Sequence, residues 1–479
     1  MNKFINFKLV LALALTTLFL ESCVPTKEIR EENTSLPEIY NDLASKDTFN
    51  TVSMKWKEFF NDPNLIALID TALVNNQELN ILLQQVDMSK NEIQAKKGEY
   101  LPFVNIQAAG EVEKVGRYTS QGANDANTDI RPGKEFPEPL SNYNIGVSAS
   151  WEIDVWKKLR NSKKVAVMEY LSSVEGKNFM VTNLISEIAN SYYELLTLDN
   201  KLIIIDQNLE LQNSALKTIQ LQKQAAKATE LGVQRLEAEV FKNRSERFTV
   251  KQEILETENK INFLVGRLPQ PVNRNSNSFI EREIDTMYVG VPSQLLVNRP
   301  DVRQAEYELA AAKLDTKIAR ANFYPSFTIK AGVGFESFNL KYLTSVPESL
   351  LYSVAGDVVA PLINRNAIKA EYSNATDRQL QAVYEYEKTI LNAYIEVVNE
   401  MSNIENLKNS YKLKEQQVDA LTNSIDITNK LFRSARADYM EVLLTQRDAL
   451  ESKMELVETK KNQLLARVSM YRHLGGGWQ

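Results

Sequence analysis

Four short stretches of the chain alternate between apolar and polar residues, which is the pattern of a strand whose two faces meet different surroundings. The clearest covers residues 325–337, where every second residue from Phe327 to Phe335 is apolar and those between are polar or glycine. The others lie near residues 101–113, 141–153 and 351–362. Each is about long enough for a tilted strand that spans a bilayer, which takes roughly 9–11 residues.

These strands cannot close a membrane barrel within one chain. A membrane barrel needs about eight strands or more, and an open sheet edge is not tolerated in lipid. If the strands lie in a membrane, several chains must share one barrel, and three chains would supply twelve strands. Four polar positions that alternate with the apolar ones are then predicted to line the lumen, a surface position near a turn being the alternative: Glu111, Glu113, Glu152 and Lys330.

Most of the remaining chain has the composition of very long helices. Residues 141–268 contain no proline, and residues 362–474 contain neither proline nor glycine, the two strongest helix breakers. Between Val383 and Ile404 apolar residues recur at a mean step of about 3.5, as in helices that supercoil around neighbours. Residues 366–434 as one helix would be on the order of 100 Å long. A shorter helix is predicted from residue 65 to about residue 100, after the start signal Asp62-Pro63-Asn64.

The order of these elements is duplicated. Residues 226–233 align with residues 435–442, and the same offset places Gly266 on Gly475. Residues 297–301 align with residues 74–78 at an offset that also places Pro325 on Pro102. We therefore expect a first structural repeat over residues 61–291 with its helix-hairpin tip near 226–233, and a second over residues 292–479 with its tip near 435–442. Each repeat is expected to hold a helix, two strands and a pair of long helices, with residues 114–140 as a loop.

The N-terminus has the features of a secretion signal over residues 1–22. Lys3 and Lys8 flank an apolar run that is too short to span a bilayer. Cys23 follows where a bacterial lipobox places its cysteine, so we predict that it is lipidated and tethers the mature chain to a membrane. A chance cysteine after a plain signal peptide is the alternative. Residues 23–60 have little periodicity and are interpreted as the lipid-anchored tether.

The composition excludes several classes of function. The 479 residues carry a net charge of −6, whereas a general nucleic-acid binder has a basic excess. A single cysteine and a single histidine rule out a disulfide framework and a Cys/His metal cluster. No nucleophile–base pair or phosphate loop is present, so no catalytic residue, cofactor or metal site is predicted. His473 is interpreted as a residue of a terminal helical turn.

Four motifs, in order along the chain, resemble those of the outer-membrane efflux channel family of the TolC type and its lipid-anchored drug-efflux branch. The first is Trp151-Glu-Ile-Asp-Val-Trp-Lys-Lys-Leu-Arg160, and the second is a two-part signature, Asn298-Arg-Pro-Asp-Val-Arg-Gln-Ala-Glu306 followed by Ala319-Arg-Ala-Asn-Phe-Tyr-Pro-Ser326. The third is Ala435-Arg-Ala-Asp-Tyr-Met-Glu-Val442, which resembles the family's periplasmic hairpin tip, and the fourth is Tyr471-Arg-His-Leu-Gly-Gly-Gly-Trp478. The likeness covers nearly the whole mature chain. It implies a mainly helical fold with a small β part, in which a trimer forms a 12-stranded outer-membrane barrel continuous with a long periplasmic α-helical barrel.

The resemblance also implies the partners. It predicts a homotrimer that contacts outer-membrane lipid, extends into the periplasm and docks a periplasmic adaptor and an inner-membrane pump of the RND type. Small molecules would pass through without chemistry. The adaptor would meet the hairpin tips at Ala226, Lys227, Ala435 and Arg436. Family members often carry glycine at both tips, where this chain has Ala226 and Ala435.

A pore constriction near the tips is a further expectation from the family. Glu441 matches an acidic position of the constriction, and Phe432 and Arg433, one turn before the second tip, would help to close the pore. The equivalent of Glu441 in the first half is Gly232, so three Glu441 carboxylates could form one ring and a second ring is not supported. A solvated charge for Glu441, and packing for Phe432 and Arg433, are the alternatives.

A different class of function also fits part of the sequence. A periplasmic coiled-coil lipoprotein without a pore, with a structural or adaptor role, explains the long helices and Cys23. It does not explain four strands that each have one apolar and one polar face.

Overall fold

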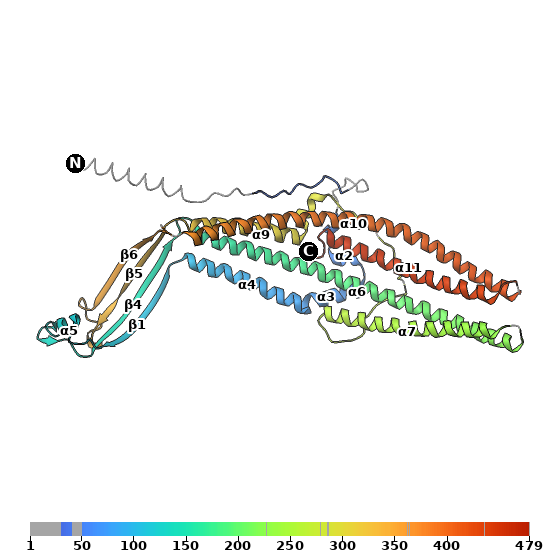
Figure 1. The fold of residues 1–479 in the computed structure, drawn as a ribbon, viewed down its shortest axis with the longest axis horizontal. Coiled ribbons are helices and arrows are strands. Elements are labelled where there is room, and N and C mark those ends of the chain that lie inside the picture. Colours follow the sequence, from blue (N-terminus) through green and yellow to red (C-terminus); the bar gives the residue numbers. More distant parts are fainter. Residues whose placement is uncertain are drawn as a thin grey trace. The chain divides into compact units, whose positions relative to one another are not determined.

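The computed structural model describes residues 30–40, 50–226, 228–277, 279–284, 287–361, 363, 365–434 and 436–478. Cys23 and the tip residues Lys227 and Ala435 lie outside these residues. The chain is mainly helical, with a small sheet part (Figure 1). The helices are α2 (Trp56–Phe60), α3 (Pro63–Asn75), α4 (Gln77–Tyr100), α5 (Ser120–Asp125), α6 (Lys158–Gln224), α7 (Glu230–Leu264), α8 (Leu295–Asn298), α9 (Pro300–Ala321), α10 (Asn366–Arg433) and α11 (Tyr439–His473). Three short 3₁₀ segments are η1 (Thr51–Ser53), η2 (Pro292–Gln294) and η3 (Leu340–Tyr342).

Contacts group the chain into two compact units. Of the described residues, the strand unit takes those within 30–31, 87–171 and 307–384, and the helical unit takes those within 32–86, 172–306 and 385–478. Each unit therefore combines segments from both halves of the sequence. The predicted repeats describe an order along the chain, while the compact units are built from corresponding parts of both repeats.

The strand unit contains one antiparallel sheet of four strands in the order β1-β4-β5-β6, which lie side by side in Figure 1. The strands are β1 (Phe103–Glu113), β4 (Leu140–Ile153), β5 (Ser326–Ser337) and β6 (Leu350–Val359). They lie where the alternating patterns predict them. Within the described residues β1 and β6 each pair along one side only, so both edges of the sheet are open.

The segment between β1 and β4 differs from the expectation of a plain loop. It contains α5 and a small hairpin of β2 (Asp129–Arg131) and β3 (Lys134–Glu135). Thr119 caps α5 by accepting a hydrogen bond from the backbone N–H of Gly122 at 3.1 Å. These elements are too short to show a period in the sequence.

Long uninterrupted helices form where the sequence lacks breakers. α6 has 67 residues and α10 has 68, and α10 ends one residue before the predicted residue 434. The helix that follows each of them is preceded by an N-cap residue. Thr229 is the N-cap of α7 and caps it with its side chain, and Asp438 is the N-cap of α11. Thr229 and Asp438 occupy equivalent positions in the two aligned hairpin tips.

The predicted helix from residue 65 to residue 100 is two helices, so that expectation was wrong. Its start is as expected, because Pro63 is the first residue of α3 and Asp62 caps it, accepting from the N–H of Asn64 at 3.0 Å. The helix then breaks at Asn76, which has an extended backbone. The Asn76 side chain donates to the Leu264 carbonyl at 2.9 Å and accepts from the N–H of Leu79 at 2.8 Å. A contact distant in sequence thus pulls Asn76 out of the helix and caps α4.

The last residues of the predicted tether, up to residue 60, are packed against the rest of the helical unit. Trp56, Phe59 and Phe60 of α2 are buried in the main core of the helical unit. Phe59 stacks on Tyr471 of α11 with ring centroids 4.0 Å apart. An aromatic pair of this kind stabilises the fold by roughly 0.5–1.5 kcal/mol beyond the effect of its buried area. The pair therefore holds α2 against α11.

Aligned residues make the same contacts in the two halves. The carbonyl of Leu264 accepts from Asn76 at 2.9 Å, and the carbonyl of His473, its aligned counterpart, accepts from Arg299 at 3.0 Å. Gly266 lies against the backbone of Asn75, and Gly475 against that of Asn298. Both glycines have positive φ, +68° and +92°. The end of one long helix is therefore packed against the start of an upstream helix in the same way twice.

Alanine at Gly475 should destabilise the protein by about 2–4 kcal/mol, because it combines a left-handed backbone with a collision. A Cβ there would lie 2.4 Å from the Asn298 carbonyl oxygen. The control is Gly98→Ala in α4, where a Cβ meets nothing within 4 Å and should stabilise the helix by about 0.5–1 kcal/mol. Urea or thermal unfolding of the two purified variants measures both effects, and equal shifts would contradict the close contact.

Candidate pore-lining and docking sites

One face of the four-stranded sheet is apolar from edge to edge. Strand register places Ile106 opposite Val147, Val147 opposite Val333, and Val333 opposite Tyr352. The neighbouring row is Val104, Ala149, Ala331 and Val354. Ile106 and Val354 are each 80% exposed. A continuous apolar face that the described residues leave exposed marks a site of interaction with another protein or with a membrane.

The opposite face is mainly polar and small. One of its rows runs Asn105, Ser148, Gly332 and Ser353. The register places the four predicted lumen residues, Glu111, Glu113, Glu152 and Lys330, all on this face. Lys330 forms an ion pair with Asp357 of β6 at 2.8 Å, and both side chains are largely exposed.

Two glycines of the polar face oppose each other at the middle of the sheet. Gly146 of β4 pairs with Gly334 of β5. A Cβ on Gly334 would lie 2.6 Å from the Ile145 carbonyl oxygen and 2.8 Å from the Gly146 Cα. Glycines inside strands often mark a bend or a close backbone approach, and here they leave room for the backbones of β4 and β5 to approach each other closely.

The assignment of the two faces predicts opposite effects at adjacent residues of β6. Val354→Lys puts a cation on the apolar face, where lysine in lipid costs roughly 2–4 kcal/mol, and should reduce the yield of folded protein in membranes. Ser353→Lys, on the polar face, should insert normally. Heat-modifiable mobility on gels measures folded yield for both, and equal loss in the two variants would contradict the assignment.

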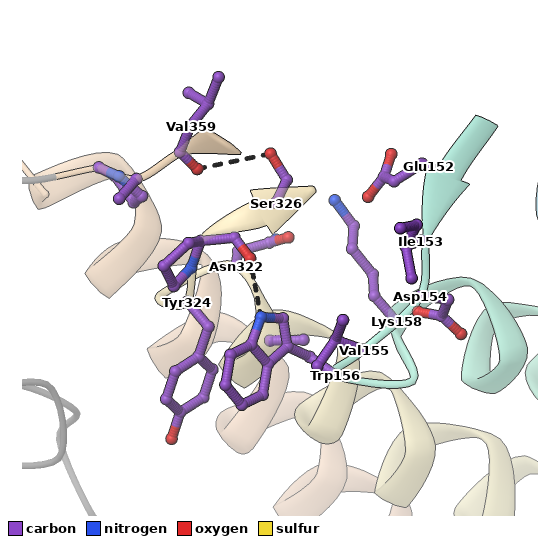
Figure 2. A pocket seen from close by; sticks show the side chains of 14 residues that line it. Glu152, Ile153, Asp154, Val155, Trp156, Lys158, Asn322, Tyr324, Ser326 and Val359 are labelled. Carbon is purple, nitrogen blue, oxygen red and sulfur yellow. Dashed lines mark hydrogen bonds between the residues drawn. The ribbon is translucent and has the colours of Figure 1, made fainter. Parts of the chain in front are cut away.

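A cavity of about 240 Å³ lies where the strands join the helices (Figure 2). It is lined by the turn between β4 and α6, the turn between α9 and β5, and the end of β6. Trp156 stacks on Tyr324 with centroids 4.6 Å apart and donates to the Pro325 carbonyl at 2.7 Å. Lys158 extends toward Glu152 in Figure 2. The aromatic contacts hold the two turns together, and the lining has no nucleophile with a neighbouring base.

Asp154 explains the motif that runs from Trp151 to Arg160. The carboxylate is buried and accepts from the backbone N–H of Leu159 at 3.1 Å and of Arg160 at 2.9 Å. It also pairs with the Arg160 side chain at 3.1 Å. Asp154 thus satisfies the free N–H groups at the start of α6 and complements the helix dipole.

The first hairpin tip contains one of the predicted docking residues in an unusual conformation. Ala226 has φ +57°, the left-handed region that glycine occupies at low cost, and its N–H donates to the Lys223 carbonyl at 2.9 Å. Alanine therefore holds a turn that glycine would adopt more easily, at a cost of roughly 1–2 kcal/mol. At the second tip Arg436 is exposed, and its N–H donates to the Leu431 carbonyl at 2.9 Å.

The three predicted constriction residues lie in different surroundings. Glu441 is exposed in the first turn of α11 and has no ion pair among the described residues. Phe432 is partly buried and packs on Tyr439 with centroids 5.5 Å apart. Arg433 ends α10, and its side chain is outside the described part. At the equivalent of Glu441 in the first hairpin, a Cβ on Gly232 would lie 3.1 Å from Ile219.

Sequence reasoning missed a cluster that joins the two hairpins near their tips. Ile219, Val233 and Leu236 of the first hairpin pack with Tyr439 of the second. Burial raises the pKa of Tyr439 to about 12, and its hydroxyl has no hydrogen-bond partner among the described atoms. The spacing of Val233 and Leu236 indicates a buried helix face, but nothing in the sequence identifies which helix covers it.

Arg299 connects the second and fourth family-like motifs. Its guanidinium pairs with Asp301 at 2.6 Å and with Glu396 at 2.7 Å, and its side chain is only 6% exposed. The indole of Trp478 donates to the Gly475 carbonyl at 2.9 Å and to that of Asn298 at 3.3 Å. α9 begins at Pro300 with Asp301 in its first turn. These motifs therefore hold the C-terminus onto α9.

His473 is buried beside this cluster as a neutral side chain. Burial lowers its pKa to about 4, with Arg472 and Arg299 acting in the same direction and Glu396 against it. Its Nε2 is 2.8 Å from Arg472, a donor, so Nε2 accepts.

Stability should therefore fall on acidification before most carboxylates titrate. His473 binds a proton near pH 6.5 in the unfolded chain but only near pH 4 in the folded chain. Its contribution to the free energy of unfolding is therefore complete above pH 6.5 and is lost as the pH falls toward 4. Between pH 7.5 and 5 the loss is about 2 kcal/mol. Urea unfolding across this range measures it; His473→Gln should flatten the slope, and an unchanged slope would contradict a neutral buried histidine.

Among the described residues, no group of three His, Cys, Asp or Glu residues could hold a metal ion. None of the helices described is long and apolar enough to cross a membrane.

A two-faced sheet joined to duplicated long helix hairpins defines a class of protein. The family model described as outer membrane efflux protein matches residues 68–267 and 291–476, and the chain belongs to this family. The resemblance to TolC-type channels is thereby confirmed. The chain is 25% identical to the pyoverdine export outer membrane protein OpmQ of Pseudomonas aeruginosa over 469 residues, 98% of this chain and 97% of the relative.

Other relatives and solved structures agree with this family. The toluene efflux pump outer membrane protein TtgI of Pseudomonas putida is 26% identical over 92% of this chain and 91% of its own length. The cation efflux system protein CusC of Escherichia coli is 25% identical over 88% of each chain. The outer-membrane channel OprN has a TM-score of 0.82 at 21% identity, over 95% of this chain and 99% of that one. The open MtrE channel of Neisseria gonorrhoeae matches with the same score and coverage at 20% identity. These structures share the fold.

Proposed function

We propose that this protein is the outer-membrane channel of a tripartite export system, a passive exit duct for small molecules. It would act as a homotrimer, with a periplasmic adaptor and an inner-membrane pump of the RND type supplying the energy. The observation that best supports this proposal is the four-stranded sheet, whose apolar face is exposed and whose two edges are open among the described residues. Membership of the outer membrane efflux protein family supports the same conclusion.

The open edges support assembly. In lipid the backbone groups along β1 and β6 would lack partners, and each unsatisfied group costs several kcal/mol. Pairing β6 of one copy with β1 of the next satisfies both edges. Three copies then give twelve strands, above the roughly eight that a membrane barrel needs. The apolar face would contact lipid, and the face with Glu111, Glu113, Glu152 and Lys330 would line the lumen.

The helix hairpins supply the periplasmic part of the duct. Six hairpins from three copies would form one tube, and the adaptor would meet it at Ala226, Lys227, Ala435 and Arg436. The left-handed Ala226 keeps a tight tip without glycine, which supports docking at that turn. Lipidation of Cys23 would anchor the chain to the outer membrane. Transport needs no bond chemistry, so the protein would not be an enzyme.

Glu441 is proposed as the constriction residue. It is exposed at the start of α11 without a partner among the described residues, whereas Phe432 packs against Tyr439. Three Glu441 carboxylates around an axis would favour cations and repel one another. Phe432 and Arg433 would support the tip by packing. A single ring is consistent with Gly232 at the matching position, where a side chain would meet Ile219.

The names of the relatives do not define one cargo. They concern pyoverdine, toluene and cations, so the proposed function is export of small molecules, with the pump selecting among them.

Planar-bilayer recording of the purified trimer tests the channel. The wild-type protein should give trimer-sized steps of conductance with a preference for cations. Glu441→Gln should lower that preference severalfold, while Glu451→Gln, an exposed glutamate elsewhere on α11, should change it little. A strain without the gene and without a redundant channel should accumulate pump substrates.

A monomer without conductance would contradict the channel and favour a coiled-coil lipoprotein without a pore. Conductance with unchanged selectivity in Glu441→Gln would remove Glu441 from the constriction while leaving the channel in place.

A further inference from the structure

Four cations gather where α4 ends and α6 begins, and we call them the basic collar: Lys97, Lys157, Arg160 and Lys164. Arg160 and Lys164, four residues apart, share one face of α6, and Lys157 directly precedes this helix. Arg160 lies over the ring of Tyr100, the last residue of α4, at 5.6 Å. Lys97 is one turn before Tyr100 on α4. The collar therefore includes one cation in contact with an aromatic ring, that of Tyr100.

The collar lies on the apolar side of the sheet. Trp151 belongs to an apolar row, opposite Ile329, and is 37% exposed. Its indole N–H donates to the carbonyl of Tyr100 at 3.2 Å. Trp151 at the end of the apolar face is therefore hydrogen-bonded to Tyr100, and the ring of Tyr100 contacts Arg160 of the collar. Tryptophan and tyrosine at such a boundary are typical of the interface between hydrocarbon and headgroups.

Three of the four cations have no ionic partner in the described part of the chain. Arg160 pairs with Asp154, whereas Lys97, Lys157 and Lys164 are exposed and have no ion pair there. Residues 154–164 contain five basic residues and one acidic residue. Uncompensated charge on this scale attracts anions from the surroundings.

The other end of the strands has no such excess. Residues 114–139, which join β1 to β4, contain four basic and four acidic residues, and residues 338–349, which join β5 to β6, contain one of each. The positive charge is therefore confined to the end of the sheet that continues into the helices. A general need for solubility would not produce this difference between two polar ends.

We propose that the basic collar binds the anionic headgroups of phospholipids in the membrane leaflet on the helical side of the sheet. Lys97, Lys157 and Lys164 would contact the phosphates, and Trp151 and Tyr100 would lie at the headgroup level. The acyl chains would lie along the apolar face. This inference rests on the proposed membrane position of the sheet and adds a lipid preference to it. Lysine near an anionic surface contributes about 1 kcal/mol each and is screened by salt.

The test uses the full-length trimer in neutral detergent and fluorescent phosphatidylglycerol, with fluorescent phosphatidylcholine as the uncharged reference. The collar variant is K97Q/K157Q/K164Q. The matched control is K217Q/K251Q/K408Q, three exposed lysines on α6, α7 and α10 that remove the same charge. Phosphatidylglycerol binding should weaken roughly fivefold per collar lysine, about a hundredfold in total. Phosphatidylcholine binding, and both lipids in the control variant, should change less than twofold.

Two results would overturn the proposal. One is equal loss of phosphatidylglycerol affinity in the collar and control variants, which would mean a general charge effect. The other is displacement of the lipid by millimolar inorganic phosphate, which would indicate a site for free anions. An acidic protein partner at the collar would leave lipid affinity unchanged in K97Q/K157Q/K164Q and so would also contradict it.

Conductance separates this proposal from the proposed function. Trimer formation and single-channel conductance should persist in K97Q/K157Q/K164Q, which also shows that the variant folds. A wild-type protein that binds phosphatidylglycerol through the collar without conducting contradicts the channel alone. A protein that conducts, but whose affinity for phosphatidylglycerol is the same in wild type and in K97Q/K157Q/K164Q, contradicts the collar proposal alone.

Discussion

The structure depends on a sheet that the chain leaves incomplete. Strand register brings the apolar residues of β1, β4, β5 and β6 into common rows, and Ile106 and Val354 on that face are largely exposed. The backbone groups along the outer sides of β1 and β6 have no strand partner among the described residues. Exposure of the apolar face to water is unfavourable in free energy, and so is exposure of the unpaired backbone groups at the edges to lipid. The proposed assembly, in which several copies close the edges within an apolar medium, would satisfy both requirements.

The duplication is conserved in geometry more than in residue type. Asn76 and Arg299 occupy matching positions and donate to matching carbonyls, those of Leu264 and His473. One is a neutral amide, and the other is a guanidinium that also holds Asp301 and Glu396. In each half this contact fixes the end of a helix hairpin to the helix that precedes the strands. The hairpins are thereby anchored at the end opposite their tips.

The two tips have diverged more than the anchors. In the first hairpin Gly232 leaves room for Ile219, and Val233 and Leu236 build an apolar cluster. In the second, Tyr439 joins that cluster while Glu441 stays exposed. One hairpin thus contributes mainly packing, and the other presents a charge beside it. A duplicated unit can divide support and electrostatics between its copies in this way.

The sequence by itself determined what depends on local patterns. Alternation located the four strands, the lack of breakers located α6 and α10, and the aligned offset matched the two hairpin tips and paired Gly266 with Gly475. The tertiary structure alone decided the break at Asn76, the partner Glu396 of Arg299 and the cluster around Tyr439. It also decided that Trp151 and Tyr100 connect the apolar face to the collar. These features rest on contacts between residues distant in sequence, whose energy outweighs local propensity and leaves no period along the chain.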